Sequence, residues 1–364
     1  MSAALGCGRS VRGLAHSLAR RRGFTSASAA SAAEIEGMGA SVIKTQYHHA
    51  NSPSPDFVGV PKTVSVIGAP LTWGQPLAGT DRGPKLLRDG GVVENLIKLG
   101  WRVNECGDLD FPSPSASDPV PDIEGNLKNC HAVGESLRLI YEAVKGAIDD
   151  NTFALTLGGD HSLGAGTLAG VLSARPDTGV IWVDAHADLN NPNISPSGNA
   201  HGMPLSMVTK GMYDWAPLPG FEWLKDVPKI DPEQIVFVGL RDIDAQERKL
   251  LMDHPFKVFT MHEVDRYGIG AVMDEALEHL KGRPLHLSYD IDACDPEIAP
   301  STGTIVRGGF NFREAHYIAE IVGDTGMLGS LDMVEVNPRL VPNCPMTAEL
   351  GNALISSVMG SRIL

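Results

Sequence analysis

GVIWVDAHAD, at residues 179–188, joins a continuous apolar run to a tail of acidic and imidazole side chains. Its apolar half contains Val and Ile without alternating polar residues, which predicts a strand buried on both faces of a parallel sheet. Asp184, His186 and Asp188 follow at alternate positions, so in an extended backbone their side chains point to one side. This pattern indicates a ligand site at the carboxyl end of a buried strand.

Apolar, β-branched segments like this one recur along the chain, with helical patterns between most of them. The eight predicted strands are Thr63–Gly68, Trp101–Cys106, Thr152–Gly158, Gly179–Asp184, Gln234–Gly239, Phe256–Met261, Pro284–Asp290 and Leu328–Glu335. Helical spacing of apolar residues is clearest over Cys130–Asp149, and shorter patterns occupy Asp274–Leu280 and Arg313–Val322. The alternation predicts a parallel sheet with helices on both faces, in one α/β domain over residues 61–364.

Further polar residues stand where other predicted strands end. His161 follows Thr152–Gly158, and Asp290 and Asp292 end Pro284–Asp290. Two acidic clusters in one crevice would repel each other and lose hydration unless cations neutralised them. The predicted ligands of a pair of bridged divalent ions are therefore His161, Asp184, His186, Asp188, Asp290 and Asp292. Ligation by oxygen and imidazole without thiolate favours Mn²⁺ over Co²⁺, Fe²⁺ or Zn²⁺; solvated strand ends are the alternative.

Composition excludes several classes of function. The 364 residues include 44 Asp and Glu against 30 Lys and Arg, and the formal charge is −14. That balance argues against a nucleic-acid partner and suits cationic or zwitterionic small molecules. No apolar window is long enough to predict a membrane span. The five cysteines are scattered and odd in number, so we predict no disulfides and a reducing compartment.

The first 33 residues differ from the rest of the chain. They contain five arginines, no Asp or Glu, and many Ser and Ala, so the remainder carries −19. This composition predicts a mitochondrial transit peptide and a place in the matrix; a disordered basic tail and a plastid address are the alternatives. Residues 34–60 are rich in Ser, Ala, His and Pro, which predicts a flexible linker.

Four motifs carry a family resemblance. They are GGDHS at 158–162, DAHAD at 184–188, SYDID at 288–292 followed by Asp295-Pro296, and MVEVNP at 333–338. With these motifs in this order, the chain resembles the ureohydrolase family, and within it the arginases, over about residues 62–362. The resemblance implies a three-layer α/β/α domain around an eight-stranded parallel sheet, and a homo-oligomer, trimeric or hexameric.

The same resemblance implies two Mn²⁺ ions per subunit. His161, Asp184, Asp188 and Asp290 would hold one ion, and His186, Asp184, Asp290 and Asp292 the other. A metal-bridging hydroxide would attack the guanidinium of L-arginine and release L-ornithine and urea. Glu335 would pair with the guanidinium, Asp188 would also orient the hydroxide, and His201 would relay protons.

The expected substrate contacts lie in two loops. By resemblance, Asn190, Ser195 and Ser197 contact the α-carboxylate, and Asp244 and Glu247 lie near the α-amine. We add two further expected substrate-binding residues, Asn199 and Thr304. Pro196, which lacks a side-chain donor, and Ala245-Gln246 depart from the arginase pattern, so the carboxylate and amine contacts can differ here.

Two other functions fit the same residues. The metal ligands alone do not separate an arginase from an agmatinase or another guanidino-acid amidinohydrolase, because the far end of the substrate is recognised by loops. A non-catalytic regulatory protein on the same fold is the third possibility, although no expected metal ligand is missing from the sequence.

Overall fold

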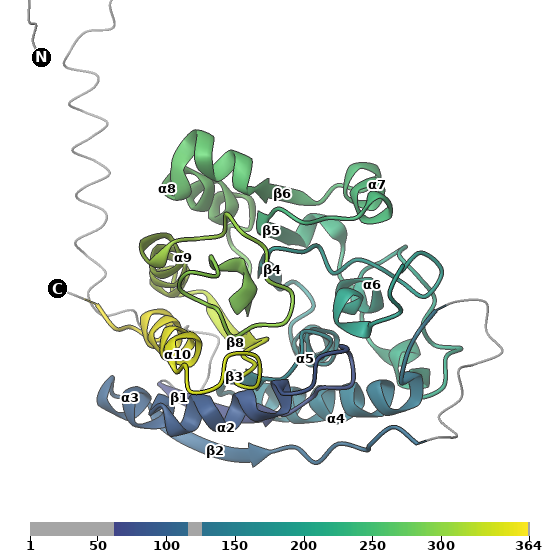
Figure 1. The fold of residues 1–364 in the computed structure, drawn as a ribbon, viewed down its shortest axis with the longest axis horizontal. Coiled ribbons are helices and arrows are strands. Elements are labelled where there is room, and N and C mark those ends of the chain that lie inside the picture. The colour runs from purple at the N-terminus through teal and green to yellow at the C-terminus, as the bar shows by residue number, and fades with distance from the viewer. Residues whose placement is uncertain (1–61, 116–125, 363–364) are drawn as a thin grey trace, which may run out of the picture. The chain divides into compact units, whose positions relative to one another are not determined.

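One sheet of eight parallel strands organises the computed structural model, which describes residues 62–115 and 126–362 (Figure 1). The strands are β1 (Thr63–Ala69), β2 (Arg102–Asp108), β3 (Phe153–Gly158), β4 (Gly179–Val183), β5 (Ile235–Leu240), β6 (Lys257–Thr260), β7 (Leu285–Asp290) and β8 (Leu328–Val334). Their order in the sheet is β2-β1-β3-β8-β7-β4-β5-β6, and every neighbouring pair is parallel. All eight predicted strands are confirmed, and no end differs from the prediction by more than two residues.

Helices cover both faces of this sheet. They are α2 (Gly83–Asp89), α3 (Val92–Lys98), α4 (Cys130–Asp149), α5 (Leu163–Ala174), α6 (Pro204–Val208), α7 (Ala245–Asp253), α8 (Met261–His279), α9 (Phe312–Asp324) and α10 (Met346–Val358). One apolar core joins the sheet to α2, α3, α8, α9 and α10, and a second joins its other face to α4, α5 and α6. In β1, Val64 and Val66 belong to the first core and Ile67 to the second. The predicted three-layer, single-domain α/β/α fold is confirmed.

The helix pattern predicted over Asp274–Leu280 covers only the last third of α8. The helix begins at Met261, where Thr260 and Glu263 form a capping box, and it bends at Gly268, whose φ is 79°. Its first turns are mostly exposed, so they carry no apolar periodicity for the prediction to detect. In contrast, the predicted helix Cys130–Asp149 matches α4.

Strand order brings the candidate site residues together. β3, β8, β7 and β4 are consecutive neighbours at the centre of the sheet, although they are far apart along the chain. In the register, Val183 pairs with Tyr289 and Asp290 pairs with Val334. The four strands therefore end at one level, and the residues that follow them share one edge of the sheet.

Several predictions concern other parts of the chain. Residues 1–33 and 34–60, the predicted leader and linker, lie outside the described residues. None of the cysteines in the described ranges forms a disulfide. Within residues 62–115 and 126–362, no helix has both the length and the apolar character that crossing a membrane requires.

Candidate active site

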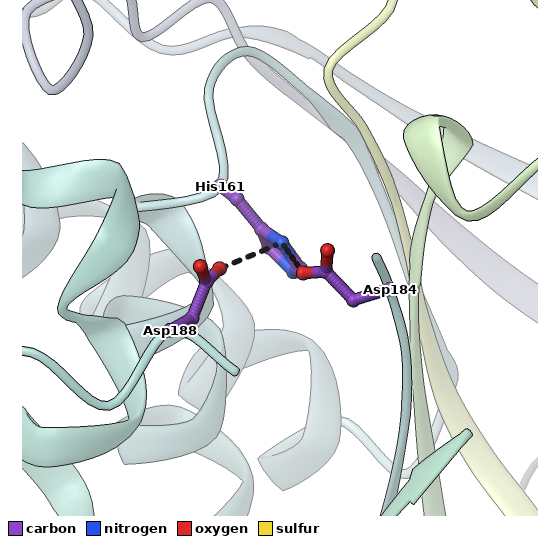
Figure 2. Close-up of side chains that lie close together, drawn as sticks. All are labelled: His161, Asp184 and Asp188. Atoms are coloured by element: carbon purple, nitrogen blue, oxygen red, sulfur yellow. Dashed lines mark ion pairs between the residues drawn. The ribbon is translucent and has the colours of Figure 1, made fainter. Parts of the chain in front are cut away.

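His161 occupies the centre of the site. Its ring stacks on Trp182, with ring centroids 4.0 Å apart and an interplanar angle of 5°. Its Nδ1 lies 3.0 Å from Asp184 Oδ2, 3.2 Å from Asp188 Oδ2 and 3.1 Å from Asp290 Oδ2. Figure 2 shows the carboxylates of Asp184 and Asp188 turned toward this ring. Three predicted metal ligands thus converge on one nitrogen.

A second cluster shares Asp184 with the first. His186 Nδ1 lies 3.4 Å from Asp184 Oδ1 and 3.2 Å from Asp292 Oδ2. The two oxygens of Asp184 therefore face different imidazoles, as a carboxylate between two cations would require. In Asp290, Oδ2 faces His161 while Oδ1 accepts a hydrogen bond from the Asp292 main-chain N–H at 2.8 Å. All six predicted ligands are gathered in these two clusters.

The electrostatics of the two clusters favour a bound cation. Burial raises the pKa of Asp188 to about 7, with Asp184 adding repulsion, and burial with Asp292 and Asp184 raises the pKa of Asp290 well above its usual value. Burial also opposes ionisation of Asp184, but the nearby imidazoles of His161 and His186 outweigh burial and lower the pKa of Asp184. Divalent ions would relieve this crowding of negative charge.

The donor atoms themselves fit metal ions. His161–Asp184–Asp188 and Asp184–His186–Asp292 each place one ligand atom per residue within 4.8 Å of the others. His161 Nδ1 has no hydrogen-bond partner among the described residues, whereas its Nε2 lies 2.9 Å from Ser288 Oγ. An imidazole with one nitrogen fixed by a hydrogen bond and the other facing carboxylates is arranged as a metal ligand.

Two acidic residues of the site have left-handed backbone conformations. The φ angles are 53° for Asp188 and 64° for Glu335. Such conformations cost about 1–3 kcal/mol when the residue is not glycine, so the surrounding structure must impose them. Here the turns after β4 and β8 bring both carboxylates back toward His161. Asp188 Oδ2 faces the imidazole ring of His161, and Glu335 Oε1 accepts the main-chain N–H of His161.

Glu335 is fixed from three sides. Its Oε1 accepts the main-chain N–H of His161 at 2.8 Å and lies 3.6 Å from His201 Nδ1, while its Oε2 accepts from Gln75 Nε2 at 2.7 Å. Burial disfavours a charged His201, but Glu335 and nearby acidic groups outweigh burial and raise the pKa of His201. Glu335 therefore favours the protonated form of His201.

A cavity of about 200 Å³ opens over the clusters. It is lined by His161, His186, Asp188, Asn190, Pro196, Ser197, His201, Gly202, Asp242, Asp244, Glu247, Asp290, Asp292 and Thr304. Apart from the histidines, every charged side chain in this lining is acidic. The cavity therefore favours a cationic ligand.

The predicted substrate residues fall into two groups. Asn190, Ser197, Asp244, Glu247 and Thr304 line the cavity, whereas Ser195 and Asn199 lie outside its lining. Ser195 Oγ accepts the Gly198 main-chain N–H at 3.0 Å, and Asn199 Oδ1 accepts from Lys128 Nζ at 3.2 Å. In this structure both residues shape the loop that carries Ser197.

Two acidic residues of the lining, Asp244 and Glu247, also bind main-chain N–H groups. Asp244 caps α7 by accepting the N–H groups of Gln246 and Glu247, and it also accepts from Asn190 Nδ2 at 3.0 Å. Glu247 accepts the Leu189 N–H at 3.0 Å, and burial, together with nearby Asp188, raises its pKa to about 8. Ala245-Gln246, the noted departure from the family pattern, forms the first turn of α7.

Sequence reasoning missed the residues that support the ligands. Gln75 binds Glu335, Ser288 binds His161, and Trp182 both stacks on His161 and donates to Asp184 Oδ2 at 3.0 Å. Ser288 and Trp182 precede metal ligands by two residues and so share their face of the strand, a signal that was available. Gln75 follows β1 and gives no local signal of this contact.

Comparison with known proteins agrees with this geometry. Residues 62–360 match the Arginase family. The human protein named "Arginase-2, mitochondrial" is 44% identical over 308 residues, covering 82% of this chain and 85% of the relative. "Arginase" of Glaciozyma antarctica is 43% identical over 316 residues, covering 85% of this chain and 90% of the relative. The solved arginase of Bacillus caldovelox has a TM-score of 0.77 and 38% identity, covering 83% of this chain and all of that one.

Proposed function

Because the chain belongs to the Arginase family, we propose that it hydrolyses L-arginine to L-ornithine and urea. The observation that carries this proposal is the acidic cavity that ends on two clusters of histidine and aspartate. The cavity's negative lining suits the guanidinium cation, and the clusters lie where that group would reach the end of the cavity.

The proposed cofactor is a pair of Mn²⁺ ions. His161, Asp184, Asp188 and Asp290 would hold one ion, and His186, Asp184, Asp290 and Asp292 the other. When bound, such a pair lowers the pKa of water and so supplies a nucleophile at neutral pH. Oxygen and imidazole ligands favour Mn²⁺. Burial raises the pKa of the nearby Cys294 thiol to about 12, which supports leaving this residue out of the ligand set.

The chain's own groups bind the guanidinium and move the proton. Glu335 pairs with the cation, and its orientation is fixed by Gln75 and by the N–H of His161. Asp188 accepts a hydrogen bond from the attacking water and orients it. His201, whose protonated form Glu335 favours, delivers a proton to the departing Nε of arginine, so that the Cζ–Nε bond breaks and Nε becomes the δ-amino group of ornithine as urea is released.

The amino-acid end of the substrate is recognised at the cavity mouth. Asn190 and Ser197 offer neutral donors to the α-carboxylate, which adds no positive charge beside the metal ligands. Asp244 and Glu247 provide oxygens for the α-amine. Agmatine lacks the carboxylate, so these contacts favour arginine over agmatine.

The test is a substrate comparison on Mn²⁺-loaded protein. Urea and ornithine release from arginine, with much slower turnover of agmatine and guanidinobutyrate, is the expected result. Asp184→Asn should abolish turnover, whereas Asp226→Asn, which makes the same substitution at an exposed residue that ends a short 3-10 helix, should leave turnover intact. Turnover of agmatine with arginine left untouched would reassign the protein to a different amidinohydrolase.

We further propose a mitochondrial address and an oligomer. The arginine-rich residues 1–33 and the mitochondrial relative support a matrix enzyme whose leader is removed, with residues 34–60 as the linker to the catalytic domain. A reporter fused to residues 1–33 should enter mitochondria, and one that stays in the cytosol would refute the address. Light scattering should give a trimer or hexamer; a monomer at working concentration would refute the oligomer.

A further inference from the structure

Arg241, the residue after β5, has no role in the function proposed above. Its guanidinium donates only to main-chain carbonyls, and within the described ranges it forms no ion pair with a carboxylate. Nη2 donates to the carbonyls of Asp292 at 2.6 Å, Val306 at 2.9 Å and Cys294 at 3.4 Å. Nη1 donates to the carbonyls of Ala293 at 3.1 Å and Gly239 at 3.3 Å. Nε donates to the carbonyl of Val306 at 3.3 Å.

Three consecutive acceptors of this set belong to the turn that carries Asp292. The planar guanidinium has five donors in fixed directions, so binding to successive carbonyls constrains the path of the main chain. A lysine at this position would present one flexible point charge and could not reproduce that arrangement. Arg241 thus holds the turn from behind, while the Asp292 carboxylate faces His186.

Gly309 leaves the space that this arrangement needs. A Cβ at Gly309 would lie 2.6 Å from Arg241 Nη2 and 2.6 Å from the Ala293 carbonyl oxygen. The neighbouring Phe310 N–H also donates to that Ala293 oxygen, at 3.0 Å. The guanidinium therefore lies packed between the Asp292 turn and the loop around residues 306–310.

The side-chain hydrogen bonds of Arg241 reach a ligand of only one of the two proposed metal positions. Asp292 belongs to the cluster with His186, and Arg241 binds its main-chain oxygen. The ligands of the other position, His161 and Asp188, follow β3 and β4 and receive no hydrogen bond from Arg241 among those described for it. Displacing the turn that carries Asp292 should therefore weaken metal binding at the His186–Asp292 position more than at the other.

We propose that Arg241 is a positioning residue for Asp292, and that it sets the affinity of the His186–Asp292 metal position. This inference rests on the two-metal centre proposed above. Loss of a group that orients a metal ligand typically weakens metal binding about 10- to 100-fold. We expect that loss at one position, with the other changed by less than about threefold.

The experiment measures Mn²⁺ bound to the full-length, metal-stripped protein at buffered free Mn²⁺ concentrations. Arg241→Met and Arg241→Lys should each weaken one of the two equivalents of Mn²⁺ about 10- to 100-fold. Arg362→Met is the control, because Arg362 also donates to main-chain carbonyls, those of Ser357, Ser361 and Glu320; unlike Arg241 it pairs with a carboxylate, Asp324, and it belongs to no part of the site. It should leave both equivalents unchanged.

Two further variants separate positioning from general damage. His186→Asn removes a ligand of the same position, so Arg241→Met added to it should cause no further loss of Mn²⁺. Gly309→Ala keeps Arg241 but crowds its guanidinium, and should selectively weaken the same equivalent. This second variant also provides the test if Arg241→Met fails to fold.

The outcomes are distinguishable. Wild type that binds fewer than two equivalents would overturn the two-metal centre, and this inference with it. Wild type with two equivalents would overturn only the inference if the Arg241 and Gly309 variants kept normal Mn²⁺ affinity, or if both equivalents weakened alike. Selective loss of one equivalent, absent in Arg362→Met, supports it.

Discussion

The hydrogen bond between Ser288 and His161 offers a quantitative test of the first metal position. Both side chains are buried, and Ser288 Oγ lies 2.9 Å from His161 Nε2. When His161 Nδ1 binds a cation, Nε2 must carry the ring proton and donate it to Ser288. Ser288→Ala leaves that N–H buried without an acceptor.

The loss of Mn²⁺ affinity in Ser288→Ala follows from the buried N–H of His161, which is left without an acceptor. An unpaired buried donor costs about 1–3 kcal/mol, which corresponds to a change of about 5- to 150-fold in an equilibrium constant. In the metal-free protein the ring can instead place its proton on Nδ1, facing Asp184, Asp188 and Asp290. The penalty therefore falls mainly on the metal-bound state, and Mn²⁺ affinity should drop by that factor.

Ser330→Ala is the matched control. Ser330 Oγ lies 2.8 Å from Nδ1 of His286, another fully buried histidine, but neither residue is a proposed metal ligand. Mn²⁺ titration of both metal-stripped variants, with denaturant unfolding in parallel, separates lost stability from lost metal binding. Unchanged Mn²⁺ affinity in Ser288→Ala, or an equal loss in Ser330→Ala, would refute the reasoning.

Four other changes test different parts of the molecule. His201→Ala should keep its Mn²⁺ content and lower kcat by about 10²- to 10⁴-fold, whereas full activity across pH would contradict a proton relay. Asn190→Ala should raise KM for arginine about tenfold or more with little change in kcat; an unchanged KM would exclude the carboxylate contact. Gln75→Leu removes a hydrogen bond to Glu335 and should lower kcat/KM about tenfold or more at unchanged Mn²⁺ content; normal kcat/KM would contradict this role. Burial lowers the pKa of Lys229 from its usual 10.5 to about 8, so between these pH values the unfolded chain binds more protons than the folded protein. The free energy of unfolding should therefore rise with pH over this range. In chemical unfolding, Lys229→Met should lose that rise and be more stable than wild type at neutral pH.

The family motifs and the apolar runs made much of the site predictable. Asp184, His186 and Asp188 alternate after one buried strand, and Asp290 and Asp292 follow another, so the pattern identified each group. Their directions were not predicted, because Asp188 lies in a turn with a φ of 53° and Asp292 lies in a 3-10 helix, not in extended backbone. Substrate contacts were less predictable. Ser195 and Asn199 lie outside the cavity lining because their side chains fix the loop itself.

Local sequence patterns predicted the eight strands to within two residues at each end, and helix α4. Side-chain periodicity is a local property, so the eight strands, helix α4 and the ligand pairs could be read without knowing what lies beside them. The exposed half of α8 escaped detection because an exposed helix needs no apolar face.

Local patterns do not show which strand ends meet, because that depends on the order of the strands in the sheet. The order β3-β8-β7-β4 places Glu335, His161 and the aspartates at one edge of the sheet, although these strands are scattered along the chain. The same long-range pairing brings Gln75 to Glu335 and Arg241 to the Asp292 turn. Such contacts depend on chain segments that approach each other only after the sheet has formed, so no local pattern encodes them.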